Sequence, residues 1–416
     1  MLVLGGTYGE RCSEPERHEI AGSGLRAAAA LADLDPGIRL ITAVNDDAGA
    51  HGALSEQAAA EFVVNHYGIR HDFRTRTKPV SWSYFTPLSA PTLNGSGAAL
   101  AAPLEADGDN ALVFGLIEAS APESAPVKVR ARRVALDPQK PRDLSLADVA
   151  DIEADDVLLI LNEDETRALG GSTHIATAAK NLLTFKDWHI AAVITKRGPR
   201  GALVTLPGAD EPHVVSPLWT PRVYPIGSGD VFAAATAWAW AEQEHDPVDA
   251  ARIGSAAAAY WCDRESLPLP ADALTGSGYR PVAVHPGMVY LAGPFFNLAQ
   301  RWLVDLVEHK LRPYRFSPLH DVGRGGVDVA QKDIDGLDHS RSVLALLDGS
   351  DPGTIFEAGY ATSRRTPLVC FAESIDHEGY KMLAGTGAEI TSDLSTAVYH
   401  AMWAAMDPHA WLNQFS

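Results

Sequence analysis

Apolar runs that are long enough for buried strands alternate with alanine-rich stretches along most of this chain. MLVLGG is followed by LRAAAALADL and then by RLITAV, and the same order returns between DDVLLILN and IAAVITK. Strands that alternate with helices favour parallel sheets, because parallel neighbours need a crossover connection that usually holds a helix. The chain is therefore expected to be of the α/β class.

A Pro- and Gly-rich stretch, residues 267–287, interrupts this alternation. It reads LPLPADALTGSGYRPVAVHPG, and a new strand, MVYLAGPFF, follows it. A chain of 416 residues can form two domains with separate cores, and domain boundaries fall in linkers of this composition. We expect a first domain at 1–276, a linker at 277–287 and a second domain at 288–416.

Residues 72–90 differ from the rest of the first domain. Their sequence, DFRTRTKPVSWSYFTPLSA, is rich in Thr and aromatic residues and alternates roughly with period two. This pattern is typical of antiparallel strands. It predicts a small β flap over a site.

The composition excludes several classes of protein. Hydrophobic residues make up 46% and charged residues 21%, as in globular proteins. A formal net charge of −19 would repel phosphates, so no nucleic-acid partner is expected. The longest strongly apolar run, residues 231–241, is too short for a membrane span, and no signal peptide is recognisable. Three widely spaced cysteines fit a reducing compartment, so we expect a cytoplasmic protein.

A glycine turn precedes the longest alanine-rich helix of the first domain. The turn consists of Gly227, Ser228, Gly229 and Asp230. Small residues let backbone amides approach a phosphate, and a helix amino terminus adds partial positive charge. Asp230 could then take a proton from an attacking hydroxyl. The alternative is an ordinary N-cap after a flexible turn.

Other motifs decide between these interpretations. Over roughly residues 1–276 the chain resembles the ribokinase-like (phosphofructokinase-B) family of sugar and nucleoside kinases. GSGD stands where that family has its anion hole and catalytic Asp, NEDE at 162–165 matches its N-x-x-E, and TKRGPRGALV at 195–204 matches its T-x-G-x-x-G segment. The resemblance implies a ribokinase-like fold, ATP and Mg²⁺ as cofactors, and Asp230 as the base. It also implies cofactor-binding residues: Gly227, Ser228, Gly229, Thr195, Gly198, Gly201, and Asn162 and Glu165 in the magnesium and phosphate network.

The chain departs from this family around the expected acceptor. The family commonly has Asn where Arg26 stands, an early Asp where Glu10 stands, and Asp-Thr-Thr where Tyr224, Pro225 and Ile226 precede the turn. These departures argue against an ordinary ribose or fructose-phosphate acceptor. Arg26 suits either an anionic acceptor or a salt bridge.

Polar residues of the second domain follow its predicted strands. Because ligands of open α/β sheets bind beyond the carboxyl ends of the strands, we expect these side chains to converge. Several carboxylates in one pocket suit glycosyl chemistry, in which one attacks the sugar and another handles protons. The set comprises Tyr290, His320, Asp321, Asp333, Asp351 and Glu357.

The loop HDVGRGG, residues 320–326, is rich in glycine. Gly323 and Arg324 could hold a phosphate through amides and a guanidinium, which would make the substrate a nucleotide. The alternative is a solvated loop. Together with His320 and Asp321, and with Gly293 in the turn after the first strand, these residues are the substrate-binding candidates.

The stretch DPGTIFEAGYA, residues 351–361, allows two interpretations. Thr354 and Glu357 fit the S/T-x-x-E capping box of a helix start. Alternatively, Glu357 is a nucleophile. Residues 288–416 resemble nucleoside 2-deoxyribosyltransferases over nearly their whole length, in VYLAGPFF, in DIDGLDHSRSVLALLDG and in this stretch.

This second resemblance implies a Rossmann-like (flavodoxin-type) fold without a cofactor. It implies that Glu357 forms a glycosyl-enzyme intermediate, that Asp351 and Asp333 contact the base and assist proton transfer, and that Tyr290 positions Glu357. Sites of this family are often completed by a neighbouring subunit, so a homo-oligomer is expected.

The two resemblances together predict a bifunctional enzyme. The second domain would cleave or exchange an N-glycosidic bond, and the first would phosphorylate a sugar, a nucleoside or a related compound. One alternative is a nucleotide N-glycosidase, with water as the acceptor. In that case the kinase-like domain would be a nucleotide sensor or an oligomerisation module.

Overall fold

The computed structural model of the chain describes residues 1–47, 54–120, 127–139, 145–312, 318–319, 327–349, 351–374 and 377–413. These residues form two compact units. The first comprises Met1–Leu218 and Pro225–Tyr279, and the second comprises Trp219–Tyr224 and Arg280–Ser416. Each unit has its own sheet and its own buried apolar cluster. In the described ranges, no helix combines the length and the apolar character that crossing a bilayer requires.

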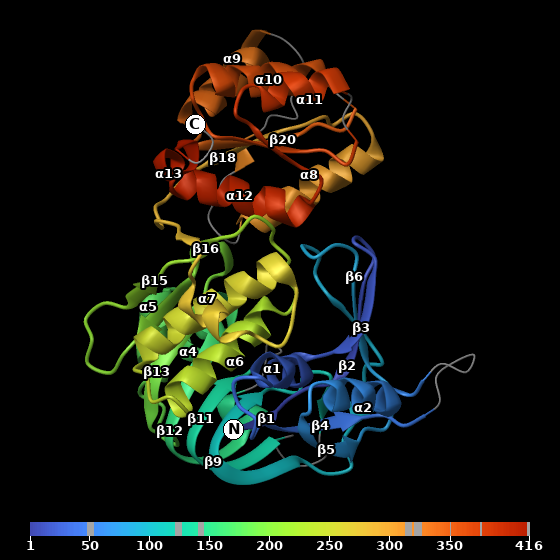
Figure 1. Cartoon of the computed structure of the whole chain (residues 1–416). Helices are drawn as coiled ribbons and strands as arrows, with labels where there is room; N and C mark the ends of the chain where they lie inside the picture. The colour runs from blue at the N-terminus through green and yellow to red at the C-terminus, as the bar shows by residue number, and fades with distance from the viewer. Residues whose placement is uncertain are drawn as a thin grey trace. The chain divides into compact units, whose positions relative to one another are not determined.

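The first unit is built on a nine-stranded sheet (Figure 1). Neighbouring strands pair in parallel except at one edge, where β14 is antiparallel to both of its neighbours, β13 and β15. In spatial order the strands are β15 (His213–Val215), β14 (Ala202–Thr205), β13 (Ile190–Lys196), β12 (Asp151–Asn162), β11 (Val127–Asp137), β9 (Leu104–Phe114), β1 (Leu2–Leu4), β4 (Arg39–Val44) and β5 (Arg70–Thr75). This arrangement confirms the predicted α/β class.

Helices pack against this sheet. Every residue of α1 (Ser23–Leu31) is buried, and its alanines allow close packing on α6 (Ser228–Ala241). α6 in turn packs on α7 (Pro247–Arg264). The remaining elements of the first unit are α2 (Glu56–His66), α3 (Leu146–Val149), α4 (Glu163–Gly170), α5 (Ile175–Leu182), η2 (Gly198–Arg200), η3 (Ala271–Thr275), β8 (Ala98–Ala99) and β10 (Ala119–Ser120). Two short strands, β16 (Leu218–Trp219) and β17 (Arg280–Pro281), lie at the boundaries of the two units in sequence.

A separate four-stranded sheet forms the flap. Its order is β3 (Arg17–Ala21), β2 (Tyr8–Cys12), β6 (Ser81–Tyr84) and β7 (Thr92–Asn94). The predicted flap therefore exists, but its composition differs from the prediction. β5, at the start of the predicted segment, joins the main sheet, and half of the flap comes from residues 8–21 through the parallel pairing of β2 with β6.

The second unit has a five-stranded, fully parallel sheet. Its order is β19 (Pro318–Leu319), β18 (Val289–Ala292), β20 (Ser342–Leu346), β21 (Leu368–Phe371) and β22 (Glu389–Thr391). Numbered within the unit this is 2-1-3-4-5, the flavodoxin order that the second resemblance implies.

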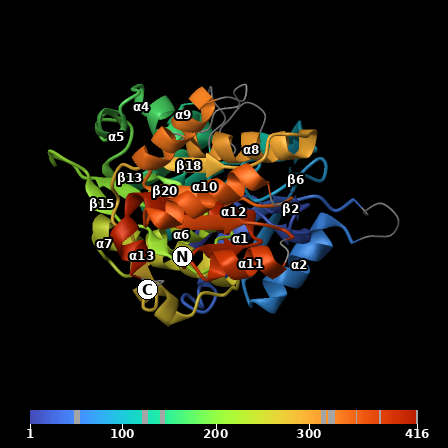
Figure 2. The same cartoon turned by 90° about the horizontal axis from the view of Figure 1, so that it is seen from above.

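Helices cover both faces of this smaller sheet (Figure 1, Figure 2). α12 (Leu394–Met406) lies on one face and α10 (Pro352–Ser363) on the other. The other helices are α8 (Leu298–Leu311), α9 (Val327–His339), α11 (His377–Ala384) and α13 (Pro408–Leu412).

Candidate active sites

The first unit holds a cavity of about 390 Å³ at the carboxyl ends of β11, β12 and β13. Flap residues form one wall, and the start of α6 forms another. This is the edge at which open α/β sheets bind ligands. The cavity is lined by Tyr8, Glu10, Arg26, Trp82, Tyr84, Pro91, Ile117, Asp137, Gln139, Asn162, Glu165, Lys196, Ile226, Gly227, Gly229 and Asp230.

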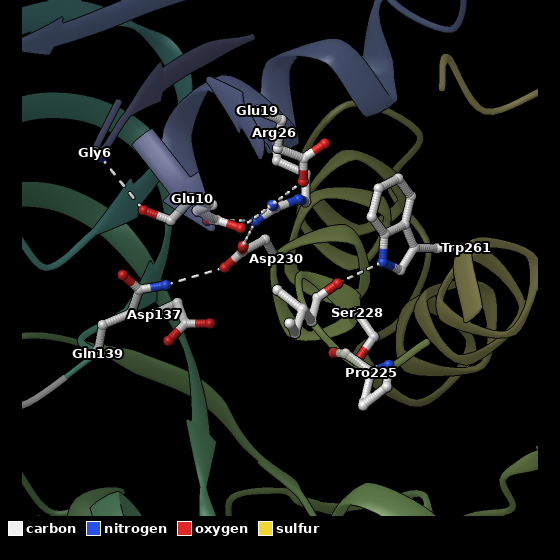
Figure 3. Close-up of polar contacts among 12 residues, drawn as sticks. Gly6, Glu10, Glu19, Arg26, Asp137, Gln139, Pro225, Ser228, Asp230 and Trp261 are labelled. Carbon is white, nitrogen blue, oxygen red and sulfur yellow. Dashed lines mark hydrogen bonds and ion pairs between the residues drawn. The ribbon is translucent and has the colours of Figure 1, made fainter. Parts of the chain in front are cut away.

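Asp230, the predicted base, lies in the first turn of α6 and lines this cavity. The helix begins after Gly227, whose φ of 79° is in the left-handed region that glycine tolerates. Both carboxylate oxygens of Asp230 have a partner (Figure 3): Oδ2 accepts from Arg26 Nη1 at 2.8 Å, and Oδ1 accepts from Gln139 Nε2 at 3.0 Å. The carboxylate of Asp230 is therefore held from two sides.

Arg26 forms the salt bridge that was one of its two predicted roles. Its Nη2 donates to Glu10 Oε2 at 2.6 Å, and its Nη1 donates to Glu10 Oε1 at 3.2 Å. Glu10, at 5% exposure, is as deeply buried as Arg26 at 4%. An anionic acceptor would find this guanidinium already occupied by carboxylates.

Sequence reasoning missed a second charged pair in the cavity. Lys196 ends β13, Asp137 ends β11, and the ammonium Nζ of Lys196 donates to Asp137 Oδ2. A Cβ added at Gly229 would stand 3.7 Å from Lys196 Nζ, so this cation lies beside the glycine turn. The available signal was a charged residue at the end of each buried apolar run, where parallel strands bring side chains together.

Burial dominates the electrostatics of these carboxylates. It raises the pKa of Asp230 to about 6, against the opposing effect of Arg26. It likewise raises the pKa of Asp137 to about 6, against the effect of Lys196. A carboxylate with a pKa close to neutrality suits a general base.

The other residues implied by the kinase resemblance fall into two groups. Asn162 and Glu165 line the cavity, where each side chain caps the other's backbone: Asn162 Oδ1 accepts from Glu165 N, and Glu165 Oε2 accepts from Asn162 N, both at 2.8 Å. The residues of the second group do not line the cavity. Ser228 Oγ donates to Pro225 O, and Thr195 is fully buried with its hydroxyl 3.1 Å from that of Thr166. Gly198 and Gly201 form the turn around η2.

In the second unit, Tyr290 and Glu357 meet. Tyr290, on β18, donates its hydroxyl hydrogen to Glu357 Oε1 on α10 at 2.7 Å. The aromatic ring is buried in the core of this unit, and the whole residue is 2% exposed. The phenol therefore fixes the carboxylate in one orientation.

The capping-box interpretation of Glu357 is wrong. The N-cap of α10 is Asp351, whose Oδ2 accepts from Thr354 N at 2.9 Å and from Thr354 Oγ1 at 3.1 Å. Thr354 is thus a capped residue rather than the cap, because Pro352 already occupies the first helical turn. Glu357 lies further along the helix and plays no part in the cap.

Burial raises the pKa of Glu357 to about 7, the Tyr290 hydroxyl lowers it, and the charges of Asp333 and Asp351 raise it. Burial, followed by Glu357 and Asp333, raises the pKa of Tyr290. The four candidates Tyr290, Asp333, Asp351 and Glu357 thus act on one another electrostatically. Gly293 follows β18, and a Cβ there would lie 3.3 Å from Leu346. The predicted residues His320, Asp321, Gly323 and Arg324 lie outside the described residues.

Comparisons with known proteins match both halves of the chain. Residues 121–272 match the model of the pfkB family of carbohydrate kinases, and residues 289–391 match that of nucleoside 2-deoxyribosyltransferase. No curated protein matches the chain.

Two solved structures of ribokinases are similar to this chain. A ribokinase from Arabidopsis thaliana, complexed with ribose and ATP, is similar with a TM-score of 0.50 and 18% identity, over 67% of this chain and 98% of that one. A ribokinase from Thermotoga maritima is similar with a TM-score of 0.48 and 18% identity, over 66% of this chain and 97% of that one. The first of these likenesses confirms the ribokinase-like fold. The predicted fusion is confirmed too: the chain carries a pfkB carbohydrate kinase domain followed by a nucleoside 2-deoxyribosyltransferase domain.

Proposed function

We propose that the chain is a bifunctional enzyme of nucleoside or nucleotide metabolism. Its second domain cleaves or exchanges N-glycosidic bonds, and its first domain phosphorylates a sugar, a nucleoside or a related hydroxyl compound. The hydrogen bond between Tyr290 and Glu357 carries the proposal, because it holds a buried carboxylate that the helix does not need for capping. That the protein is a cytoplasmic homo-oligomer stays a prediction.

The glycosyl step begins with an ionised Glu357. Its carboxylate attacks the anomeric carbon as the bond between that carbon and the base nitrogen breaks. The electron pair of that bond stays on the nitrogen, and protonated Asp333 or Asp351 donates a proton to the leaving base. The resulting glycosyl ester is opened by a second base in transfer or by water in hydrolysis. A pKa of about 7 leaves much of Glu357 ionised near neutral pH.

In the kinase step Asp230 accepts the hydroxyl proton of the acceptor. The cavity could take a phosphoryl group beside Gly229, because the Nζ of Lys196, a cation suited to phosphate, would lie 3.7 Å from a Cβ at that position. ATP supplies the phosphoryl group when bound, and the turn from Gly227 to Gly229 would hold its phosphates.

The residues present would hold a magnesium ion only indirectly, through its water molecules. Within the described residues, no three His, Cys, Asp or Glu side chains gather as metal ligands. Mg²⁺ often keeps several waters and binds through one or two carboxylates together with phosphate oxygens. Asn162 and Glu165, at the cavity wall, would hold it in this way.

One observation favours a second candidate function. Asp230 is engaged by both Arg26 and Gln139, so a hydroxyl must either share a carboxylate oxygen with one of them or displace it. If neither yields, the first domain binds a nucleotide without turnover, and the chain is a nucleotide N-glycosidase with a sensor domain.

Mass spectrometry of reaction mixtures tests both proposals. Nucleosides and nucleotides are incubated with and without a second free base and MgATP, using wild type, Glu357→Gln and Asp230→Asn. Release of base that Glu357→Gln abolishes supports the glycosyl function, and base exchange distinguishes transfer from hydrolysis. Phosphorylation lost only in Asp230→Asn supports the kinase, whereas ATP binding without a product supports the sensor.

A further inference from the structure

Arg26 is one buried cation among three carboxylates (Figure 3). It binds Glu10 through both terminal nitrogens and Asp230 through one, and its Nη2 lies 3.5 Å from Glu19 Oε1. One positive charge thus faces three negative ones. Planar guanidinium groups suit such shared carboxylate contacts, because their donors point in fixed directions.

The surroundings leave the guanidinium little freedom. A Cβ at Gly227 would lie 2.4 Å from Arg26 Nε, so the glycine turn packs directly on the side chain. On another side the Arg26 Cζ lies 5.6 Å from the ring centroid of Trp261, whose indole N–H donates to Ile226 O at 2.8 Å. Arg26 is therefore fixed by the same turn that would hold a phosphate.

The charges of the cavity have a consequence for its ligand. Arg26 and Lys196 are the cations among its described lining residues, and both are paired with carboxylates. The negative charges of the lining outnumber these two cations, because it contains four carboxylates: Glu10, Asp137, Glu165 and Asp230. A phosphate or carboxylate on the acceptor would meet surplus negative charge in a partly dry site.

We infer that Arg26 is a positioning residue that fixes Asp230 for catalysis and restricts the acceptor to uncharged compounds; this rests on the proposed kinase function. The acceptor hydroxyl donates to Asp230 Oδ1 in place of Gln139, because a neutral amide is displaced more easily than a guanidinium. Its proton passes to Asp230 as its oxygen bonds to the terminal phosphorus of the donor. The bond to the leaving diphosphate breaks, and Arg26 keeps Oδ2 throughout.

The same geometry predicts how Asp230 titrates. Arg26 lowers its pKa, whereas burial, Glu10 and Asp137 raise it. Without Arg26, the carboxylates would lose their shared cation, and Asp230 would stay protonated to higher pH. The charged and titratable groups that face Asp230 are Arg26 on α1, Glu10 and Tyr8 on β2, Asp137 on β11 and Lys196 on β13.

The first test follows the titration of Asp230 in the full chain. Aspartate is labelled with ¹³C at Cγ, and Asp230→Asn identifies the signal. We expect Arg26→Met to move the midpoint up by about 1–3 pH units, and added Glu10→Gln to reverse part of the shift. Arg130→Met, at an exposed ion pair with Glu153, is the matched control and should change nothing. Arg26→Lys, which keeps the charge but cannot bridge both carboxylates, is used if Arg26→Met does not fold, and should give a smaller upward shift.

The second test compares ribose with ribose 5-phosphate, and adenosine with its monophosphate, by calorimetric binding and by phosphorylation. Wild type should prefer the uncharged member of each pair by at least about tenfold. As the pH is lowered, the turnover of the Arg26 variants should begin to fall at a higher pH than the turnover of wild type. An unmoved Asp230 titration, or tighter binding of the phosphorylated probes, overturns the inference even if the kinase is active. If wild type phosphorylates nothing, the kinase proposal fails, and the titration and binding data still decide the role of Arg26.

Discussion

Tyr290 and Glu357 are 67 residues apart in the chain, yet the phenol of one donates to the carboxylate of the other at 2.7 Å. This bond takes up Oε1 of Glu357. In the part of the chain that the structure describes, no hydrogen bond to Oε2 is found. One oxygen is held in place, and the second is the atom that would attack the sugar in the proposed reaction.

Tyr290→Phe should slow base release by about 10- to 100-fold, because a hydrogen bond to a charged group is worth about 1.5–3 kcal/mol. The acid limb of the pH–rate profile should also move to higher pH, since the Tyr290 hydroxyl lowers the pKa of Glu357. Tyr360→Phe, which removes an exposed hydroxyl bonded to Asp338, is the control. Equal losses in both variants would argue against positioning by Tyr290.

Base release should fall as the pH drops below about 7, because protonated Glu357 cannot attack. Stability should depend on pH in the opposite sense. The folded pKa of Glu357 exceeds its ordinary value of 4.5, so its favourable contribution is present below pH 4.5 and is lost as the pH rises through about 7. Thermal unfolding should therefore show that the stability of Glu357→Gln rises relative to that of wild type from pH 4 to pH 8. A constant difference between the two proteins would contradict this assignment.

Asp351 caps a helix and has a second, proposed role in proton transfer, and substitution can separate the two. Asp351→Ala should destabilise the protein by about 1 kcal/mol through loss of the N-cap of α10, whereas Asp351→Ser keeps a capping oxygen. Both variants lose the carboxylate, so both should slow base release if Asp351 assists the proton. Denaturant unfolding and base-release assays are run on the same samples. Full activity in Asp351→Ser would reduce Asp351 to a cap.

Gly227 and Gly229 should respond differently to alanine. At Gly227 a Cβ would collide with Arg26 Nε, and its positive φ costs another 1–2 kcal/mol or so. At Gly229 the nearest atom would lie 3.7 Å away. Gly227→Ala should lower the melting temperature and abolish phosphorylation, whereas Gly229→Ala should keep the stability. Comparable melting temperatures for the two variants would show that the turn is looser than described.

Lys196→Met should destabilise the protein by about 3–5 kcal/mol, because it leaves the buried Asp137 without its cation. Adding Asp137→Asn should restore most of this stability. The double variant should still bind ATP more weakly than wild type, since the cation beside the glycine turn remains absent. Urea unfolding measures the first effect, and nucleotide titration measures the second. Unchanged ATP affinity would exclude a phosphate contact for Lys196.

The sequence was informative where the signal is local. Alternating apolar runs predicted both parallel sheets, and the order of motifs placed Asp230 at the start of a helix and Glu357 beside a strand end. Parallel strands present their carboxyl ends at one edge, so the location of a site followed from the pattern itself.

Long-range pairings could not be predicted in the same way. Arg26 and Asp230 are 204 residues apart, and Lys196 and Asp137 are 59 residues apart. Charged residues at the ends of two apolar runs indicated that Asp137 and Lys196 share one edge of the sheet, but the local sequence does not specify which side chains pair. The capping box failed for a related reason: Thr354 and Glu357 match its spacing, but Asp351 three residues earlier caps the helix and leaves Glu357 free to meet Tyr290.

The segment Trp219–Tyr224 interrupts the first unit in sequence but belongs to the second in structure. Val223 N donates to Thr396 Oγ1 at 2.9 Å, and His400 Nε2 lies 2.8 Å from Thr220 O. A cut in the linker at 277–287 would therefore separate the catalytic motifs without separating the folded units. The carboxyl-terminal fragment would lose the segment Trp219–Tyr224. The amino-terminal fragment would keep this segment without Thr396 and His400, which it contacts in the intact chain. A segment of the second unit thus lies within the sequence of the first, so the two proposed activities are best dissected by point substitution in the intact chain.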